Sequence, residues 1–183
     1  MPVDVRFLTA VAAVAVVAVV PGCGGKSSTT TSASAVESWA SGVCTAFATW
    51  KSAVNGAVSS VRSHPTKDTM QQGLTTAQTA TSTLTKTLKD LGMPSTASGQ
   101  AARSTLNTLE DQLQHGVSQI KDAAAGVKTS GDVISAMATA SGTITTMRAQ
   151  LDAARSTLAS LPAGELHDAF ATVPACEPFR SKK

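Results

Sequence analysis

Apolar residues recur along most of this chain at alternating spacings of three and four. This period places them on one face of an α-helix. Helix-breaking sequences at His64-Pro65, Gly92 to Pro94 and Ser130-Gly131 divide the pattern into four stretches. Nowhere do apolar and polar residues alternate with the period of a β-strand. The pattern therefore predicts an all-α chain.

Each stretch carries one apolar stripe. In chain order the stripes run over 36–61, 70–91, 102–127 and 133–161. A capping-box pattern, Ser34 with Glu37, predicts the start of the first helix. The later helices are expected to begin near Thr66, Ser98 and Asp132, and a short helix over 165–172 is expected before Pro174.

Four helical segments with short connections predict an antiparallel up-down-up-down four-helix bundle with a short C-terminal tail helix. An extended coiled coil that dimerises is the alternative. The Pro and Gly breaks favour antiparallel return of the chain and a monomer. The bundle domain is expected to cover residues 35–183.

The N-terminal residues follow a different pattern. Residues 7–20 form an apolar run in which only Thr9 is polar. This run is short for a membrane span and fits the hydrophobic region of a secretory signal. Val20-Pro21-Gly22-Cys23 follows directly and resembles the lipobox of bacterial lipoprotein precursors. Val20, Gly22 and Cys23 match that motif, whereas Pro21 replaces the usual alanine or serine.

The resemblance implies that residues 1–22 are a removable signal peptide and that Cys23 is lipidated with acyl chains such as palmitate. Two or three acyl chains would anchor the protein stably at the extracytoplasmic face of the cell membrane. The Gly/Ser/Thr-rich residues 23–34 are then expected to form a flexible linker. The alternative is a plain secretory signal with Cys23 as an ordinary thiol. The chain is also similar to alanine- and threonine-rich lipoproteins of high-GC Gram-positive bacteria, which implies a location but no activity.

Three cysteines are an odd number for an exported protein. Once Cys23 is assigned to lipid, Cys44 and Cys176 remain as a disulfide pair in an oxidising compartment. In the predicted topology the first helix begins and the fourth helix ends at the same end of the bundle, so this pair can meet.

The aromatic residues predict how the C-terminal tail folds. Trp39 and Trp50 are eleven residues apart, which is about three helical turns, and therefore share a face with Phe47 between them. Phe170 and Phe179 flank Cys176 in sequence. We expect the tail to fold back on the first half of helix 1. A structural cap is favoured there over an aromatic ligand cleft.

Composition and charge exclude some functions. Aromatic residues make up 3% of the chain, charged residues 15%, and tyrosine is absent. The net charge of +3 comes from Arg180, Lys182 and Lys183, since the rest of the chain carries equal numbers of basic and acidic side chains. Without a basic stripe or stacking rings, nucleic acid is not an expected partner.

The sequence contains no catalytic or metal-ligand motif. His64, His115 and His167 fall at different heights of the predicted bundle, and Met70 and Met137 occupy stripe positions that favour core packing over metal binding. We therefore expect no enzyme, no cofactor and no metal. Several stripe positions are small or polar, which predicts either close helix packing or an internal cavity: Ala77, Thr81, Ala102, Gly116, Ala124, Ala140 and Ala154.

These observations favour a non-enzymatic envelope binding or interaction module. The alternative is a carrier or sensor of a small hydrophobic or lipid-like ligand held in the bundle core. Large apolar pockets or a continuous groove would favour the carrier. A tightly packed core with an exposed apolar patch at the far end would favour protein binding.

Overall fold

A computed structural model describes residues 28–180 of the chain, and over this range the protein is all-helical. The predicted signal peptide and Cys23 lie outside the described residues. The elements are α1 (Ser28–Ser63), α2 (Lys67–Asp90), α3 (Gly99–Ala125), α4 (Ser130–Ala159), α5 (Glu165–Thr172) and a 3-10 helix η1 (Pro174–Phe179). The predicted short helix over 165–172 is thus confirmed as α5, whereas η1 was not expected.

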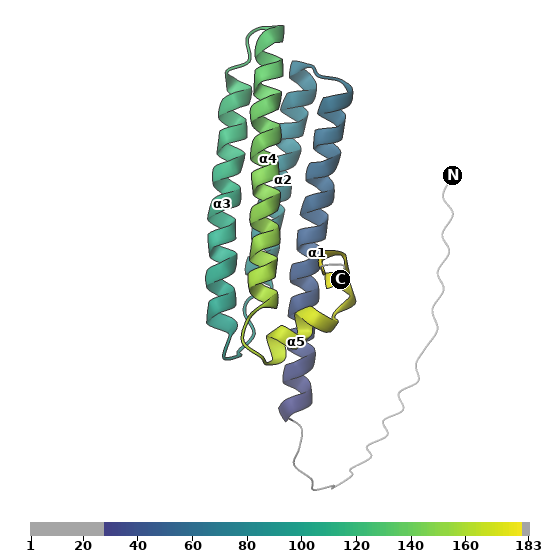
Figure 1. Ribbon diagram of the computed structural model, residues 1–183, viewed down its shortest axis with the longest axis vertical. Helices are drawn as coiled ribbons and strands as arrows, with labels where there is room; N and C mark the ends of the chain where they lie inside the picture. The colour runs from purple at the N-terminus through teal and green to yellow at the C-terminus, as the bar shows by residue number, and fades with distance from the viewer. Residues whose placement is uncertain (1–27, 181–183) are drawn as a thin grey trace, which may run out of the picture.

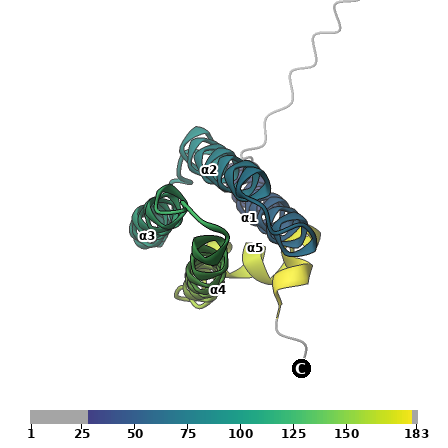
Figure 2. The same ribbon diagram turned by 90° about the horizontal axis from the view of Figure 1, so that it is seen from above.

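The four long helices stand side by side along the long axis of the molecule (Figure 1). Viewed from above, they form two pairs, α1 with α2 and α3 with α4, and α2 also packs on α3 (Figure 2). Helix α5 and η1 pack on the first half of α1, and α5 also touches α4. We call the end that carries α5 the proximal end. The other end, where the α1–α2 and α3–α4 connections lie, is the distal end.

Threonine side chains cap two of the long helices. Thr66 precedes α2 and Thr129 precedes α4, and each forms a capping box with the residue three positions later, Thr69 or Asp132. Gly92 follows α2 with φ of +62°, a left-handed conformation that favours glycine. The predicted starts of these helices are therefore correct to within two residues.

The start of α1 differs from the prediction. The helix begins at Ser28, so residues 28–34 of the expected linker are helical and the Ser34–Glu37 pair lies inside α1 rather than at its cap. No glycine or proline occurs between residues 28 and 41. Once the packed part of a helix has formed, each further residue adds one hydrogen bond without a new nucleation cost, which allows this extension.

The predicted stripes form the buried faces, with two local shifts. Gly116 and Ala136 are buried, whereas their neighbours Val117 and Met137 are only half-buried. The smaller residue of each pair takes the closest approach to the adjacent helix. At Gly116 a Cβ atom would lie 2.7 Å from Cγ and Sδ of Met147 on α4, so the Met147 side chain occupies the space that a larger residue at position 116 would need.

Candidate functional site

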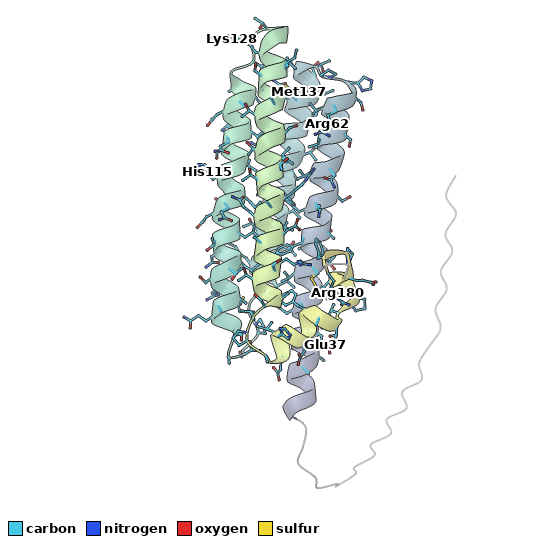
Figure 3. All side chains as sticks on the ribbon, viewed as in Figure 1. Glu37, Arg62, His115, Lys128, Met137 and Arg180 are labelled. Carbon is cyan, nitrogen blue, oxygen red and sulfur yellow. A yellow bond between two sulfur atoms is a disulfide. The ribbon has the colours of Figure 1, made fainter. Side chains whose placement is uncertain are left out.

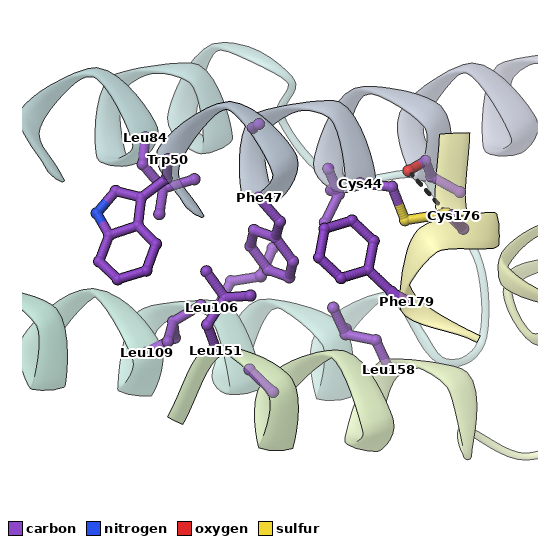
Figure 4. Packing of buried hydrophobic residues seen from close by; sticks show 14 of the residues in the cluster. Cys44, Phe47, Trp50, Leu84, Leu106, Leu109, Leu151, Leu158, Cys176 and Phe179 are labelled. Carbon is purple, nitrogen blue, oxygen red and sulfur yellow. Dashed lines mark hydrogen bonds between the residues drawn. A yellow bond between two sulfur atoms is a disulfide. The ribbon is translucent and has the colours of Figure 1, made fainter. Parts of the chain in front are cut away.

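The C-terminal tail is bound to α1 by a disulfide and two aromatic pairs. Cys44 of α1 and Cys176 of η1 are bonded, with Cα atoms 5.1 Å apart. Trp39 meets Phe170 edge-on at a centroid distance of 5.8 Å. Phe47 meets Phe179 at 6.4 Å beside the disulfide (Figure 4). The predicted Cys44–Cys176 pair and the predicted return of the tail onto helix 1 are both present.

A long groove lies on the outer side of α1, between α2 and the tail. Its volume is about 1090 Å³. We call it the α1–α2 groove. It is lined by Glu37, Ser38, Ser41, Gly42, Thr45, Ala46, Thr49, Trp50 and Ala53 of α1, by Thr75, Thr76, Thr79, Ala80, Thr83, Leu84 and Thr87 of α2, and by Val173 and Pro174 of the tail.

Short side chains make the groove deep enough to reach the core. Its floor includes Trp50 and Leu84, which are both almost fully buried. Trp50 is fixed there because its Nε1–H donates to Oγ1 of Thr81 at 3.1 Å. Thr81 is the one buried polar residue among the side chains that the structure describes. Buried polar groups need such partners, so this hydrogen bond holds the indole in place.

Part of the groove is less polar than its composition indicates. Thr75 and Thr76 donate their hydroxyl hydrogens to the carbonyl oxygens of Gln71 and Gln72, one turn earlier in α2, at 3.0 and 2.9 Å. Hydroxyls bound to their own backbone have less capacity for a ligand. The distal end of the groove is therefore largely a surface of methyl groups.

The groove carries almost no charge. Among its lining residues only Glu37 is ionisable, and Glu37 lies near the proximal end of α1 (Figure 3). The nearest lysine in sequence, Lys51, is directed elsewhere: its Nζ lies 3.8 Å from Asp152 of α4 and 5.8 Å from the ring centre of Phe179. An anion in the groove would have no basic side chain to pair with.

The small residues of the predicted stripes lie in two different environments. Ala102, Gly116 and Ala154 are buried in the packed core. Towards the distal end, other small residues leave an apolar cavity of about 50 Å³. Its lining includes Gly73, Ala77, Ala124 and Ala140, together with Met70 and Met137. Cavities that bind benzene are nearer ~150 Å³, so this cavity is small for a ligand.

The histidines do not converge. His64 and His115 are exposed on the α1–α2 connection and on α3, and His167 is half-buried on α5. Within residues 28–180 no group of three His, Cys, Asp or Glu side chains is placed to hold a metal ion. In the same range no helix has both the length and the apolarity needed to cross a membrane.

The distal end carries no apolar patch in the part of the chain that the structure describes. Ile134 is the one large apolar side chain classed as exposed there. A single exposed apolar residue is ordinary for a protein surface. Of the two surfaces expected to distinguish the candidate functions, a groove is therefore present and a distal apolar patch is not.

Comparison with protein-family models, curated protein sequences and solved structures finds no match to this chain. The candidate site is therefore described from the residues of this chain alone. The apolar pattern of the sequence does not predict the groove, although one other signal is present. Between Glu37 and Arg62 the only charged residue of α1 is Lys51, and α2 has none between Asp68 and Lys86.

Proposed function

We propose that the mature protein is a lipoprotein anchored through Cys23 at the extracytoplasmic face of the membrane, and that it acts as a non-enzymatic binding module. The α1–α2 groove is its binding surface. The observation that carries this proposal is the volume of the groove, about 1090 Å³, which lies directly above the buried side chains of Trp50 and Leu84. Ligand sites are typically ~300–1000 Å³ and mostly apolar.

We also propose that the long helices form an up-down-up-down four-helix bundle. The packing of α2 against both α1 and α3, and of α3 against α4, supports this topology, as do short connections at alternating ends (Figure 1). The topology would place the groove opening at Glu37, the Cys44–Cys176 disulfide and the lipidated linker at one end. The groove would then begin close to the membrane surface.

The tail contributes to the proposed site. Val173 and Pro174 line the groove next to the α1 residues around Gly42. They lie three and two residues before Cys176, whose disulfide to Cys44 holds η1 on α1. We therefore expect the disulfide to keep this wall in place. A Cβ atom at Gly42 would lie 2.6 Å from Cδ2 of Leu91, so α2 approaches α1 closely at this end.

Site-specific photo-crosslinking in the native membrane tests the binding surface. A crosslinking amino acid would replace Thr79 in the groove or, as a control, Ser118 on the exposed outer face of α3. We expect adducts of discrete mass from position 79 that disappear when Thr49 is also replaced by Phe. The same adducts from both positions would contradict the proposal.

Lipidation is tested separately by metabolic labelling with a fatty-acid analogue. The wild-type chain should be labelled and recovered with membranes, whereas Cys23→Ala should be neither. Equal labelling of the two proteins would disprove lipidation at Cys23 but would leave the proposal of a binding groove intact.

A further inference from the structure

We infer that the α1–α2 groove binds an uncharged single-chain amphiphile, of the class of a monoacylglycerol or a long-chain alcohol. This inference rests on the proposed function, because it assigns a ligand class to the same groove. It also moves the expected hydrophobic ligand from the bundle core to the outer side of α1. The distal cavity has less than a tenth of the volume of the groove.

The length of the groove fits an extended chain. Its α1 lining runs from Glu37 to Ala53, which corresponds to about 24 Å at ~1.5 Å per residue. Along this length Ala53, Ala80 and the threonine methyl groups provide apolar surface, above the buried side chains of Trp50 and Leu84. An acyl chain laid along them would remove apolar area from water on both sides, which stabilises the complex.

The charge of the groove selects against an ionised headgroup. Among the described residues that line it there is no lysine, arginine or histidine, and the one ionisable side chain is the acidic Glu37. A carboxylate or phosphate headgroup beside Glu37 would be repelled and left without a counter-charge. An uncharged headgroup with hydroxyl groups has no such cost.

The two ends of the groove differ in hydrogen-bonding capacity, and this difference orients the ligand. Glu37, Ser38 and Ser41 lie at the proximal end and can accept hydrogen bonds from a headgroup. Thr75 and Thr76 lie at the other end, and their hydroxyls are bound to the α2 backbone. The headgroup is therefore assigned to the proximal end and the terminal methyl to the end near Ala53.

Tryptophan fluorescence reports occupancy directly, because the chain has two tryptophans and no tyrosine. Trp50 lines the groove, whereas Trp39 does not and donates instead to the Gly92 carbonyl at 2.8 Å. Trp39→Phe leaves Trp50 as the only reporter, and Trp50→Phe leaves Trp39. Circular dichroism checks that both proteins fold. The probe is a monoacylglycerol with two bromine atoms in its chain, which quench an indole at contact.

We expect the probe to quench Trp50 several-fold more than Trp39. The fatty acid with the same brominated chain should bind several-fold more weakly at neutral pH. Thr49→Phe with Thr79→Phe fills the groove at exposed positions and should abolish quenching. The matched control, Thr108→Phe with Ser118→Phe on the exposed face of α3, should leave quenching unchanged.

Equal quenching of the two tryptophans, tighter binding of the fatty acid, or no quenching of Trp50 would each overturn the inference. Crosslinking from position 79 then separates the two proposals. Specific adducts with a protein or with a second copy, without quenching of Trp50, would disprove the ligand class but keep the groove as a binding surface. Failure of both measurements would disprove both.

Discussion

The proximal and distal halves of the molecule are packed differently, although the same four helices run through both. At the proximal end Trp39, Phe47, Phe170 and Phe179 pack around the disulfide, and the core there is continuous across all the helices and the tail. At the distal end a separate small cluster of Met70, Val127, Val133 and Ala136 is buried. The apolar cavity lies beside this cluster.

This difference follows from side-chain size. Large aromatic rings fill the space between helices, whereas at alanine and glycine stripe positions a neighbouring side chain must fill it, as Met147 does at Gly116. Near Ala77 and Ala140 the helices do not approach closely enough, and a void remains. The well-packed half also contains the tail residues that form one wall of the groove, so the proximal end of the candidate site lies against the tightly packed part of the core.

Of the changes that test this difference between the two halves, loss of the disulfide should have the largest effect on stability. The bond joins residues 132 apart in sequence, and on the chain-entropy model it stabilises the fold by about 4–5 kcal/mol. Cys44→Ser with Cys176→Ser should lower the free energy of unfolding by that order in urea titration. A background with Cys23→Ser avoids thiol exchange in both proteins. An unchanged urea midpoint would show that the stability of the proximal end does not depend on the disulfide.

A larger side chain should change the stability of the protein differently in the two halves. Ala102 is fully buried in the proximal core, whereas Ala140 lines the distal cavity. Ala102→Val should destabilise by about 1–3 kcal/mol through overpacking. Ala140→Val should be neutral or stabilising by up to ~1 kcal/mol, because the added methyls enter a void. Both variants carry the same helix-propensity cost, so their difference measured by thermal unfolding isolates packing. Equal losses of stability in the two variants would contradict a difference in packing between the two halves.

The Trp50–Thr81 hydrogen bond holds the Trp50 side chain, which lies under the groove, in the core. Thr81→Val keeps the shape of the side chain but leaves the indole N–H without its acceptor, which should cost about 1–2 kcal/mol. The same substitution in a Trp50→Phe background should cost less, because no donor is left unpaired. A double-mutant cycle in urea measures the coupling. Zero coupling would mean that the hydrogen bond does not position the ring.

The smallest effect is expected at the distal cap of α4. Hydrogen bonds from the backbone N–H of Lys128, then from the backbone N–H and hydroxyl of Thr129, lower the pKa of Asp132 below its usual value of 3.8. A lowered native pKa means that the carboxylate stabilises the fold above the unfolded pKa, and that this contribution is lost as pH falls through the native pKa.

Asp132→Asn should therefore lower stability at neutral pH and reduce the difference from wild type as the pH falls below about 4. Thermal unfolding across this pH range measures the effect, with Asp111→Asn on the exposed face of α3 as the control. A difference from wild type that stays constant with pH would contradict the role assigned to the carboxylate.

The inner faces could be predicted from sequence because burial imposes a helical period on residues such as Val43, Phe47 and Trp50. The tail position followed from the cysteines and phenylalanines. The groove could not be predicted in this way, because serine and threonine on outer faces have the pattern of ordinary solvated positions. Its depth depends on non-local distances such as that between Gly42 and Leu91. The early start of α1 was missed because a Gly/Ser/Thr-rich composition predicts a linker, yet residues 28–34 contain no helix breaker.

Native-state hydrogen exchange tests the central comparison most directly, because it measures the opening free energy of each helix segment. Amides in residues 43–54 and 147–158 should exchange only through global unfolding, whereas those in residues 57–77 and 123–140 should exchange through smaller openings. Reduction of the disulfide should lower protection first in residues 165–179. Equal protection along each long helix, or greater protection at the distal end, would contradict the proposed division between a rigid proximal half and a loosely packed distal half.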